Sequence, residues 1–521
     1  MAALITDEFR LINADNFIDS VSDPQNAYYI FIGLPNPVGE GYGRTPNWNQ
    51  DPPAPTDNFS YIRHCYDTMM YGRRITPANI RRVVRRLDWA RGTRYEQYRD
   101  DYSVSNVSPI TGSTRLYDCN YYIITSDFRV YICLSNGSNV DNPDGNASED
   151  EPSFVDTEPA PAGTSGDGYI WKYLFTIAPS DVIKFDSTEY ITVPSEWLTS
   201  DNPQIESIRE SGNSDINNNQ IKEVYIDNRG SGYVDGNAKS FEIIGDGSGS
   251  VVSIDVNAGE ISRAVITSGG KGYTWGLVDL SSINNLNSKN AKLDVIIPPS
   301  KGHGFDIYNE LGTDRILIYA RFDDSTQDFP IDTKFAQIGL IKNPTAKNSN
   351  NLFDANSFTA TGALRLSSIT GTPIIGEEIK QINNDGSIAK GYVVSFDADT
   401  SVLKYIQDRS LYYNPGNGTP PAYDNTDYRG IGVSGRKLPF LSDGSVIEGL
   451  ESGITAAIDV NFDGASVTVG NRSIDLGVEF TKGLAESQIN KPSGEILYLD
   501  NRPAVERNPR QKEDVKIILE F

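Results

Sequence analysis

Side chains that carry out acid–base or nucleophilic chemistry are scarce in this chain of 521 residues. Its two histidines are His64 and His303, and a Ser-His-Asp triad or a Cys-His dyad must pass its proton through one of them. His64 is next to Cys65, and neighbouring residues on a strand point to opposite faces. His303 lies among glycines in "SKGHGF" with no nucleophile motif beside it, so we expect a histidine in a turn. The sequence therefore predicts no catalytic residues and no enzyme activity.

The cysteines and acidic residues offer little for metal binding or sugar hydrolysis. Cys65, Cys119 and Cys133 lack CxxC spacing, and two histidines add no local pair of zinc ligands. Two carboxylates that cleave a sugar must face each other across it, whereas Glu377 and Glu378 are adjacent in the chain. We therefore expect no metal and no cofactor, and glycosidase activity is disfavoured.

The charge balance limits the partners of the chain. It has 46 Lys and Arg against 70 Asp and Glu, a net charge of −24, which repels nucleic acid and anionic lipid. No run of about 18 apolar residues is present, and no basic segment precedes an apolar one near the start. We expect no nucleic-acid partner, no membrane partner and synthesis in a reducing cytoplasm.

One segment is strongly basic. Between Arg73 and Arg99 there are nine arginines and two acids, a local charge of +7. In "TPANIRRVVRRLDW", Thr76 can cap and Pro77 can begin a helix with one apolar stripe and arginines on the opposite face. Such a face either pairs with acids of the same chain or clamps carboxylates of another subunit, with nucleic acid a distant third. The interface candidates are Arg81, Arg82, Arg85, Arg86, Arg91 and Arg94.

Short elements are expected around this basic segment. Apolar residues in "FRLINADNFIDSV" suit an amphipathic helix over 9–21, and "AYYIFIGL" predicts a strand over 27–34. Two β-rich runs flank an "SDF" turn within 119–134, which is typical of a hairpin.

The stretch "GDGYIWKYLFTI" predicts a strand with a very aromatic face. Four aromatic rings on one face bury roughly 600–1,000 Å², worth on the order of 15–25 kcal/mol before chain entropy is subtracted. The other face is mixed in character, so we expect it to be only partly covered. Such a stripe is core more often than a ligand platform. Its alternating apolar residues are Tyr169, Trp171, Tyr173, Phe175 and Ile177.

Two further regions read as short strands and turns. "IKEVYIDNRGSGY" at 221–233 recurs as "ISRAVITSGGKGY" at 261–273, which predicts a compact β domain with internal pseudo-twofold symmetry. Between 360 and 480, strands about ten residues apart predict a small barrel or sandwich. Apolar residues alternate up to Phe521, which indicates a buried strand at this end.

These patterns predict a mainly β, multidomain fold with a smaller α+β part, sandwich-like or barrel-like domains, and short helices near the N-terminus. The expected regions are an N-terminal core with the arginine-rich helix (1–210), an inserted β domain with the repeats (215–300), a return to the core (301–350), an inserted small barrel or sandwich (351–485), and strands completing the core (486–521).

Several stretches in colinear order resemble a known family. They are "TDEFRLINADNF", "PPAPTDN", "RRLDWARGTRY", "GDGYIWKYLFTI", "EYITVP", "FAQIGLIKNP" and "EILYLDNRPAV" followed by "DVKIILEF". They resemble the baseplate wedge protein of T-even-like contractile-tail phages, the gene product eight family, over about 5–200, 305–345 and 490–521. The regions 215–300 and 350–485 look like β insertions.

The resemblance implies a structural subunit without enzyme activity, located in the virion tail baseplate and assembled in the host cytoplasm. It implies a homodimer that contacts other baseplate wedge proteins and holds the baseplate until infection triggers sheath contraction.

An alternative is a receptor-binding or carbohydrate-binding tail protein, which predicts exposed clusters of Trp and Tyr. A depolymerase ranks last.

Overall fold

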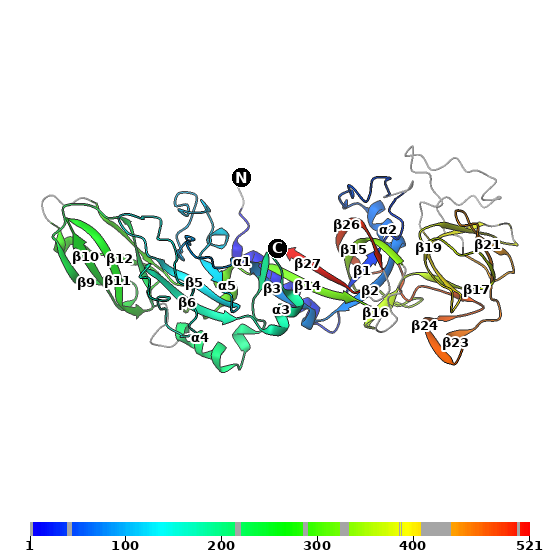
Figure 1. Ribbon diagram of the computed structural model, residues 1–521. Coiled ribbons are helices and arrows are strands. Elements are labelled where there is room, and N and C mark those ends of the chain that lie inside the picture. Colours follow the sequence, from blue (N-terminus) through cyan, green and yellow to red (C-terminus); the bar gives the residue numbers. More distant parts are fainter. Residues whose placement is uncertain are drawn as a thin grey trace. The chain divides into compact units, whose positions relative to one another are not determined.

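The computed structural model describes residues 4–38, 44–213, 220–284, 290–323, 333–384, 386, 388–407, 439–507 and 511–521. Strands dominate these residues, and they form several separate sheets (Figure 1). The predicted mainly β, multidomain fold is confirmed.

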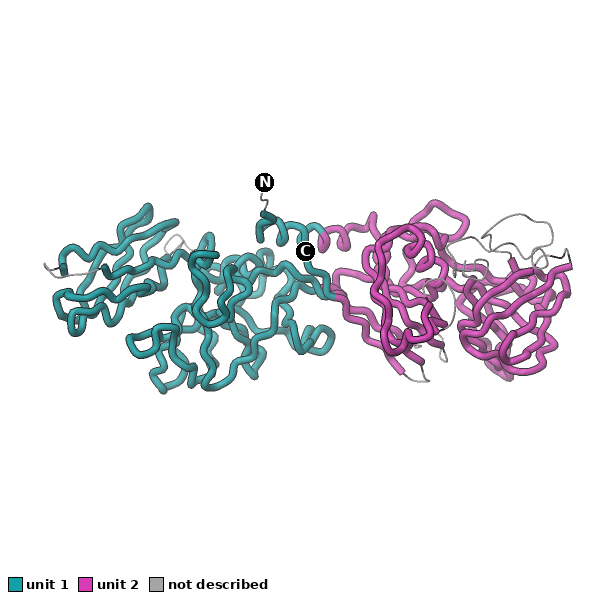
Figure 2. The backbone as a smooth tube through the Cα atoms, turned by 90° about the horizontal axis from the view of Figure 1, so that it is seen from above, with its two compact units in different colours: residues 1–16, 81–317, 518–521 teal, residues 17–80, 318–517 magenta. Residues whose placement is uncertain are grey.

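The chain forms two compact units (Figure 2). Unit 1 contains residues 1–16, 81–317 and 518–521, and unit 2 contains residues 17–80 and 318–517. The first boundary between them falls inside the region 1–210 that was expected to be one core. The expected region boundaries stay predictions.

The helices are few and mostly short. The predicted helix over 9–21 is present as α1, and His64 lies on α2 and not on a strand. Asn58 caps α2 by accepting a hydrogen bond from the Tyr61 backbone N–H. The α-helices are α1 (Asp7–Ser22), α2 (Phe59–Thr68), α3 (Pro179–Phe185), α4 (Pro203–Asn213) and α5 (Ile307–Leu311).

A five-stranded antiparallel sheet forms the centre of unit 2. Every residue of β1 is buried, because β1 lies inside the sheet between β2 and β15. The predicted strand over 27–34 is therefore confirmed. In sheet order the strands are β16 (Ser357–Thr359), β2 (Met69–Ile75), β1 (Tyr28–Gly33), β15 (Thr333–Lys342) and β26 (Glu495–Arg507).

The second part of unit 2 is a small closed barrel (Figure 1). The pairing of β20 with β17 joins the two ends of the sheet, and the interior is filled by apolar residues such as Leu364, Ile379 and Val393. Of the two alternatives predicted for this region, a small barrel or a sandwich, the described strands form the barrel. Its strands, in order, are β20 (Val402–Ile406), β19 (Ile388–Asp397), β18 (Glu378–Ile382), β21 (Val446–Gly449), β22 (Thr455–Ile458) and β17 (Gly362–Thr370), with β25 (Leu484–Ala485) beside β17 and the hairpin β23 (Gly464–Val469) and β24 (Arg472–Phe480) as a separate pair.

The aromatic strand lies in the core of unit 1. It is β6 (Tyr169–Thr176), and it pairs with β5 (Arg129–Asn136), which forms the expected hairpin with β4 (Tyr122–Ile124). Trp171 is fully buried, stacks on Tyr169 at 5.2 Å between ring centroids, and meets Tyr95 edge-on at 5.8 Å. The aromatic stripe is therefore core, as predicted.

The opposite face of β6 is more covered than expected. Lys172 is 2% exposed and Leu174 is fully buried. The Lys172 ammonium donates a hydrogen bond to the Thr157 carbonyl oxygen at 2.6 Å, so its charged end is held inside the protein. Burial lowers the pKa of Lys172 to about 8.

The repeat region forms a separate β core within unit 1. The two repeat copies place β8 and β11 at matching positions, and Gly270 and Gly230 both adopt φ near +60°, which glycine tolerates best. The tyrosines that end the copies, Tyr233 and Tyr273, are both buried. The strands are β8 (Glu223–Asn228) with β13 (Lys292–Ile296), and the sheet β11 (Glu260–Lys271), β10 (Ser248–Asn257), β9 (Gly236–Gly245) and β12 (Gly276–Val278).

The predicted arginine helix is wrong. After a single 3-10 turn at Pro77–Asn79, the chain enters a strand, β3 (Ile80–Arg85), in which Val83 and Val84 pair with Thr192 and Ile191. The spacing of Ile80, Val83 and Val84 fits a helix, but β-branched residues also favour strands. Pairing with a distant strand therefore decides the local structure. The sheet order is β27 (Glu513–Glu520), β14 (Arg315–Phe322), β3 and β7 (Tyr190–Thr192).

Candidate functional site

The first two interface candidates, Arg81 and Arg82, are held by acids from distant parts of unit 1. Arg81 Nε donates to Asp181 Oδ2 at 2.8 Å, and its guanidinium lies 5.0 Å from the ring centroid of Phe185. Arg82 forms an ion pair with Asp15, and its guanidinium lies 4.3 Å from the Tyr308 ring centroid. Burial lowers the pKa of Arg82 from its usual value.

The next two arginines also bind within the chain. Arg85 Nη2 donates to the carbonyl oxygens of Asp118 and Cys119 at 3.1 and 3.0 Å. Arg86 donates to Asp88 and Asp186, each at 2.9 Å, and the hydrogen bond to Asp88 raises its pKa. These contacts match the self-paired alternative for the basic segment.

The last two interface candidates lie on the surface. The Arg91 side chain is 74% exposed and pairs with Glu149 at 2.8 Å, and the exposed Arg94 donates to the Asn142 side-chain oxygen at 3.3 Å. Contacts at such exposed positions are weak, because water competes for both partners. Arg91 and Arg94 are therefore the members of the predicted set that another protein can reach most easily.

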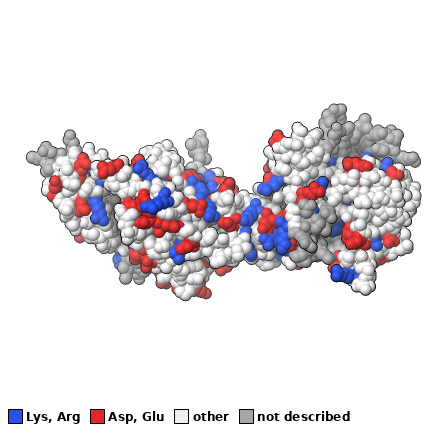
Figure 3. All heavy atoms as spheres, in the orientation of Figure 1, with Lys and Arg blue, Asp and Glu red and all other residues white. Residues whose placement is uncertain are grey.

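Acidic and basic side chains are interspersed over the face shown in Figure 3. Across the described residues, no helix combines the length and the apolar character needed to cross a membrane. Within the same residues, no group of three or more His, Cys, Asp and Glu side chains is arranged to hold a metal ion. Cys65, Cys119 and Cys133 are buried, and they form no disulfide bond within the described part of the chain.

His303 is a buried residue of a turn. It is 5% exposed, and its Nδ1 lies 2.6 Å from Glu310 Oε1. The other oxygen of Glu310 accepts from the Gly304 backbone N–H at 2.7 Å, and Tyr98 meets the imidazole edge-on at 4.8 Å. With both oxygens of Glu310 engaged, this arrangement fixes the loop before α5.

Two buried carboxylates organise loops. Glu96 is fully buried and accepts hydrogen bonds from the backbone N–H groups of Ile110, Thr111 and Asn120 at 3.2, 2.8 and 2.6 Å. Glu377 is 1% exposed and accepts from backbone N–H groups that include that of Ser452 at 2.9 Å. A carboxylate that receives several backbone donors replaces the water those donors would otherwise bind.

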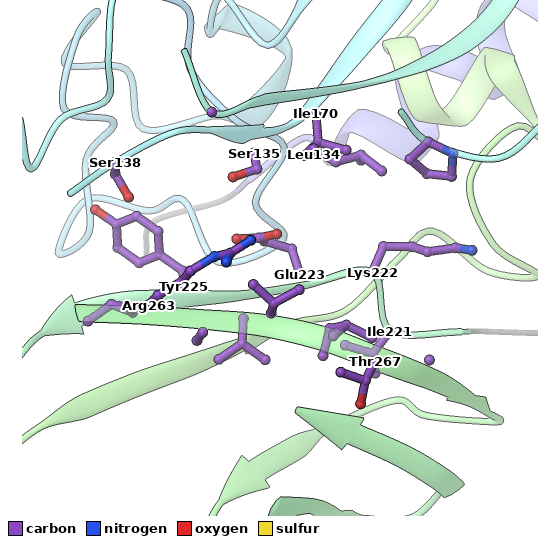
Figure 4. A pocket seen from close by; sticks show the side chains of 18 of the residues that line it. Leu134, Ser135, Ser138, Ile170, Ile221, Lys222, Glu223, Tyr225, Arg263 and Thr267 are labelled. Carbon is purple, nitrogen blue, oxygen red and sulfur yellow. The ribbon is translucent and has the colours of Figure 1, made fainter. Parts of the chain in front are cut away.

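A pocket of about 690 Å³ lies in unit 1 beside the repeat strands β8 and β11. Glu223, Tyr225 and Arg263 project into it from these strands, with Ser135 and Ser138 on the opposite side (Figure 4). The prediction from sequence missed this pocket. One signal was present, because Glu223 and Arg263 occupy equivalent positions of the two repeat copies and carry opposite charges.

Exposed aromatic residues are the feature that a receptor-binding protein would need. The five tryptophans include Trp48, Trp171 and Trp197, which are fully buried, and Trp275, which is 52% exposed. Leu277 and Ile244, paired on neighbouring strands, are also about half exposed near it. Phe59 and Phe9 are also exposed, at 86% and 53%, so exposed aromatic side chains occur at more than one place among the described residues.

Comparison with known proteins finds two similarities. Residues 123–225, which contain β5, β6 and β7, match the family model described as "Bacteriophage T4, Gp8". The chain is 28% identical over 227 residues to the baseplate wedge protein gp8 of Enterobacteria phage T4, which covers 37% of this chain and 60% of that protein. The chain therefore spans about three fifths of the length of this relative. The resemblance to the gene product eight family that the sequence indicates is confirmed, and the chain is gp8-like over the matched residues.

Proposed function

We propose that this protein is a structural subunit of a bacteriophage tail baseplate wedge, located in the virion and assembled in the host cytoplasm. The observation that carries the proposal is the match of residues 123–225 to the gp8 family. These residues contain the β5–β6 pair and its fully buried Trp171, so the match covers the core of unit 1 and not an isolated loop.

The contacts made by the buried acids and by four of the arginines support the proposal. The buried acids Glu96, Glu310 and Glu377 are engaged with backbone donors, and Arg81, Arg82, Arg85 and Arg86 bind within the chain. Such contacts stabilise a defined shape, and a subunit that is bound by several neighbouring subunits requires such a shape. On this basis the protein acts without catalysing a reaction.

Location in the baseplate can be tested directly. An affinity tag on the chain, labelled with gold in purified phage particles, should place the label at the baseplate end of the tail in electron micrographs. Label on the capsid, on the fibres alone, or only in the unassembled fraction of the lysate would contradict the proposal.

The proposal extends to the assembly of the protein. The chain forms a homodimer that bridges other wedge proteins during baseplate assembly and passes on the signal for sheath contraction. Analytical ultracentrifugation of the purified protein should give the mass of two chains at micromolar concentration. A monomer at that concentration would rule out a stable homodimer while leaving the baseplate location open.

A further inference from the structure

The pocket beside β8 and β11 has features of a binding site that the structural role leaves unexplained. Its volume of about 690 Å³ is in the range of pockets that hold small ligands. The strands β8 and β11 approach each other at both ends, where Ile221 N–H donates to the Gly269 carbonyl and Ile261 N–H donates to the Arg229 carbonyl. Between these hydrogen bonds, the outward-facing side chains of both strands line the pocket.

Glu223 is one of the charged residues that line this pocket. Its side chain projects from β8 into the cavity (Figure 4). Among the residues that the structure describes, no hydrogen bond or ion pair to its carboxylate is found. A partly buried carboxylate without a counter-charge is costly, and a cation in the cavity would reduce that cost.

The surrounding charges leave this position open to a cation. Lys222, which precedes Glu223 in the chain, forms an ion pair with Glu158, with 3.0 Å between Nζ and Oε2. Arg263 lines the same pocket, but its guanidinium is not within ion-pair distance of Glu223. Tyr225 packs under Arg99, whose guanidinium lies 4.0 Å from the ring centroid.

The surroundings of Glu223 favour the neutral form of its carboxyl group, because no positive charge next to it in the described part of the chain stabilises the carboxylate. Burial raises its pKa from 4.5 to about 8, and no neighbouring cation offsets this effect. Burial raises the pKa of the Cys133 thiol on β5, and the nearby Glu223 adds to this effect. In the unliganded protein the carboxyl is therefore largely protonated at pH 7.

We propose that this pocket binds an alkylammonium or guanidinium group, with the Glu223 carboxylate as its counter-ion. The chemistry corresponds to a Lys or Arg side chain of another protein, and a free aliphatic diamine offers the same group. The site goes beyond the proposed baseplate role and does not depend on it, because it rests on the pocket alone.

The probes are acetyl-Gly-Gly-Lys-Gly-Gly-amide, the same peptide with norleucine in place of lysine, and putrescine. Binding to the full chain is measured at low ionic strength by ligand-observed NMR and isothermal titration calorimetry. We expect the lysine peptide to bind at least tenfold more tightly than the norleucine peptide. Affinity should rise about tenfold between pH 7 and pH 9, because the cation requires the ionised carboxyl.

Three variants locate the site. Glu223→Gln keeps the shape of the side chain and should abolish binding of the lysine peptide. Glu242→Gln removes the same charge from an exposed position of the same β domain and should leave binding unchanged. Arg263→Ala should preserve or strengthen binding, since it removes a like charge from the pocket. Circular dichroism spectra that match the wild type show that each variant is folded.

Each possible result of these binding experiments either supports the proposal or overturns it. Binding of the lysine peptide that is lost in Glu223→Gln supports the proposal, and equal Glu223-dependent binding of putrescine supports it with a free amine as a second source. Equal binding of the lysine and norleucine peptides, unchanged binding in Glu223→Gln, or no binding of either amine at millimolar concentration would overturn it.

Discussion

At the scale of single residues, three buried carboxylates of this protein bind its own backbone N–H groups. Glu96 shows this most directly, because one carboxylate receives three backbone N–H groups and the hydroxyl of Thr111. The loop 106–120 depends on that carboxylate, since it has no regular ladder of its own apart from a short 3-10 turn. The Glu96 carboxylate thus has a structural role in the fold.

Replacement of Glu96 by Ala should destabilise unit 1 by about 3 kcal/mol, because it leaves buried N–H donors without acceptors. Urea unfolding followed by tryptophan fluorescence measures the change. The control is Glu149→Ala, which removes one exposed ion pair and should cost less than about 1 kcal/mol. Equal losses in the two variants would show that Glu96 does not hold the loop.

Glu223 should also make stability depend on pH. Its pKa is about 8 in the folded protein against 4.5 as the reference, so the folded state keeps a proton that the unfolded chain releases. Its contribution is constant below pH 4.5, falls by up to about 1.4 kcal/mol per pH unit between the two values, and is constant again above pH 8.

Stability of the wild type and of Glu223→Gln, measured by urea unfolding from pH 4 to pH 9, should therefore diverge in favour of the variant as the pH rises. Glu242→Gln, at an exposed position, should follow the wild type throughout. Parallel curves for the wild type and Glu223→Gln would contradict the assignment.

At the scale of elements, β6 and β3 show how strands depend on what they pair with. The alternating rings of β6 pack into one cluster with β4, β5 and the loop that carries Tyr95. In β3, buried Val83 and Val84 are joined to β7, while arginines from the same strand reach acids on α1 and α3. The same short segment therefore contributes to both the core and the ion pairs.

Replacement of Trp171 by Ala should cost about 3–5 kcal/mol, because it removes a fully buried indole and leaves a cavity beside Tyr169 and Tyr95. Trp275→Ala is the matched control, since this indole is 52% exposed and its loss should change stability by about 0.5 kcal/mol or less. Hydrogen exchange of the backbone amides in β4, β5 and β6 measures this loss of stability. A small change in Trp171→Ala would mean that β6 does not hold unit 1 together.

At the scale of the whole molecule, the proposed baseplate role requires surfaces that other proteins can bind. Unit 1 carries the segment 123–225 that matches the gp8 family. It also carries Arg91 and Arg94, the exposed members of the arginine set. We expect a partner with exposed carboxylates to compete with Glu149 and Asn142 for these two guanidinium groups.

The double substitution Arg91→Glu and Arg94→Glu should block the association of this protein with the other wedge proteins while its melting temperature stays within a few degrees of the wild type. Arg82→Glu should instead lower the melting temperature, because Arg82 is largely buried against Tyr308 and pairs with Asp15. Co-purification of wedge intermediates and thermal scans distinguish the two effects. Normal wedge assembly by the double variant would exclude this interface.

Much of the fold was predictable where a pattern is local. The period of two in β6, the matching repeat copies and the turn-punctuated strands of the barrel each indicate their element directly, because side chains alternate along any strand. The candidate site was less predictable. All six arginines were visible in the sequence, but three of their partners, Asp15, Asp181 and Glu149, lie 58 to 100 residues away from them in the chain.

The sequence alone determined that the protein is acidic and mainly β, that it is poor in catalytic side chains, and that it resembles gp8. The tertiary structure decided that residues 80–85 form a strand, which arginines stay exposed, and that Glu223 and Arg263 share one pocket. The physical reason is that a hydrophobic period reports only which side of a segment is buried. Which distant segment buries it, and which charges then meet, depends on contacts between residues far apart in the chain.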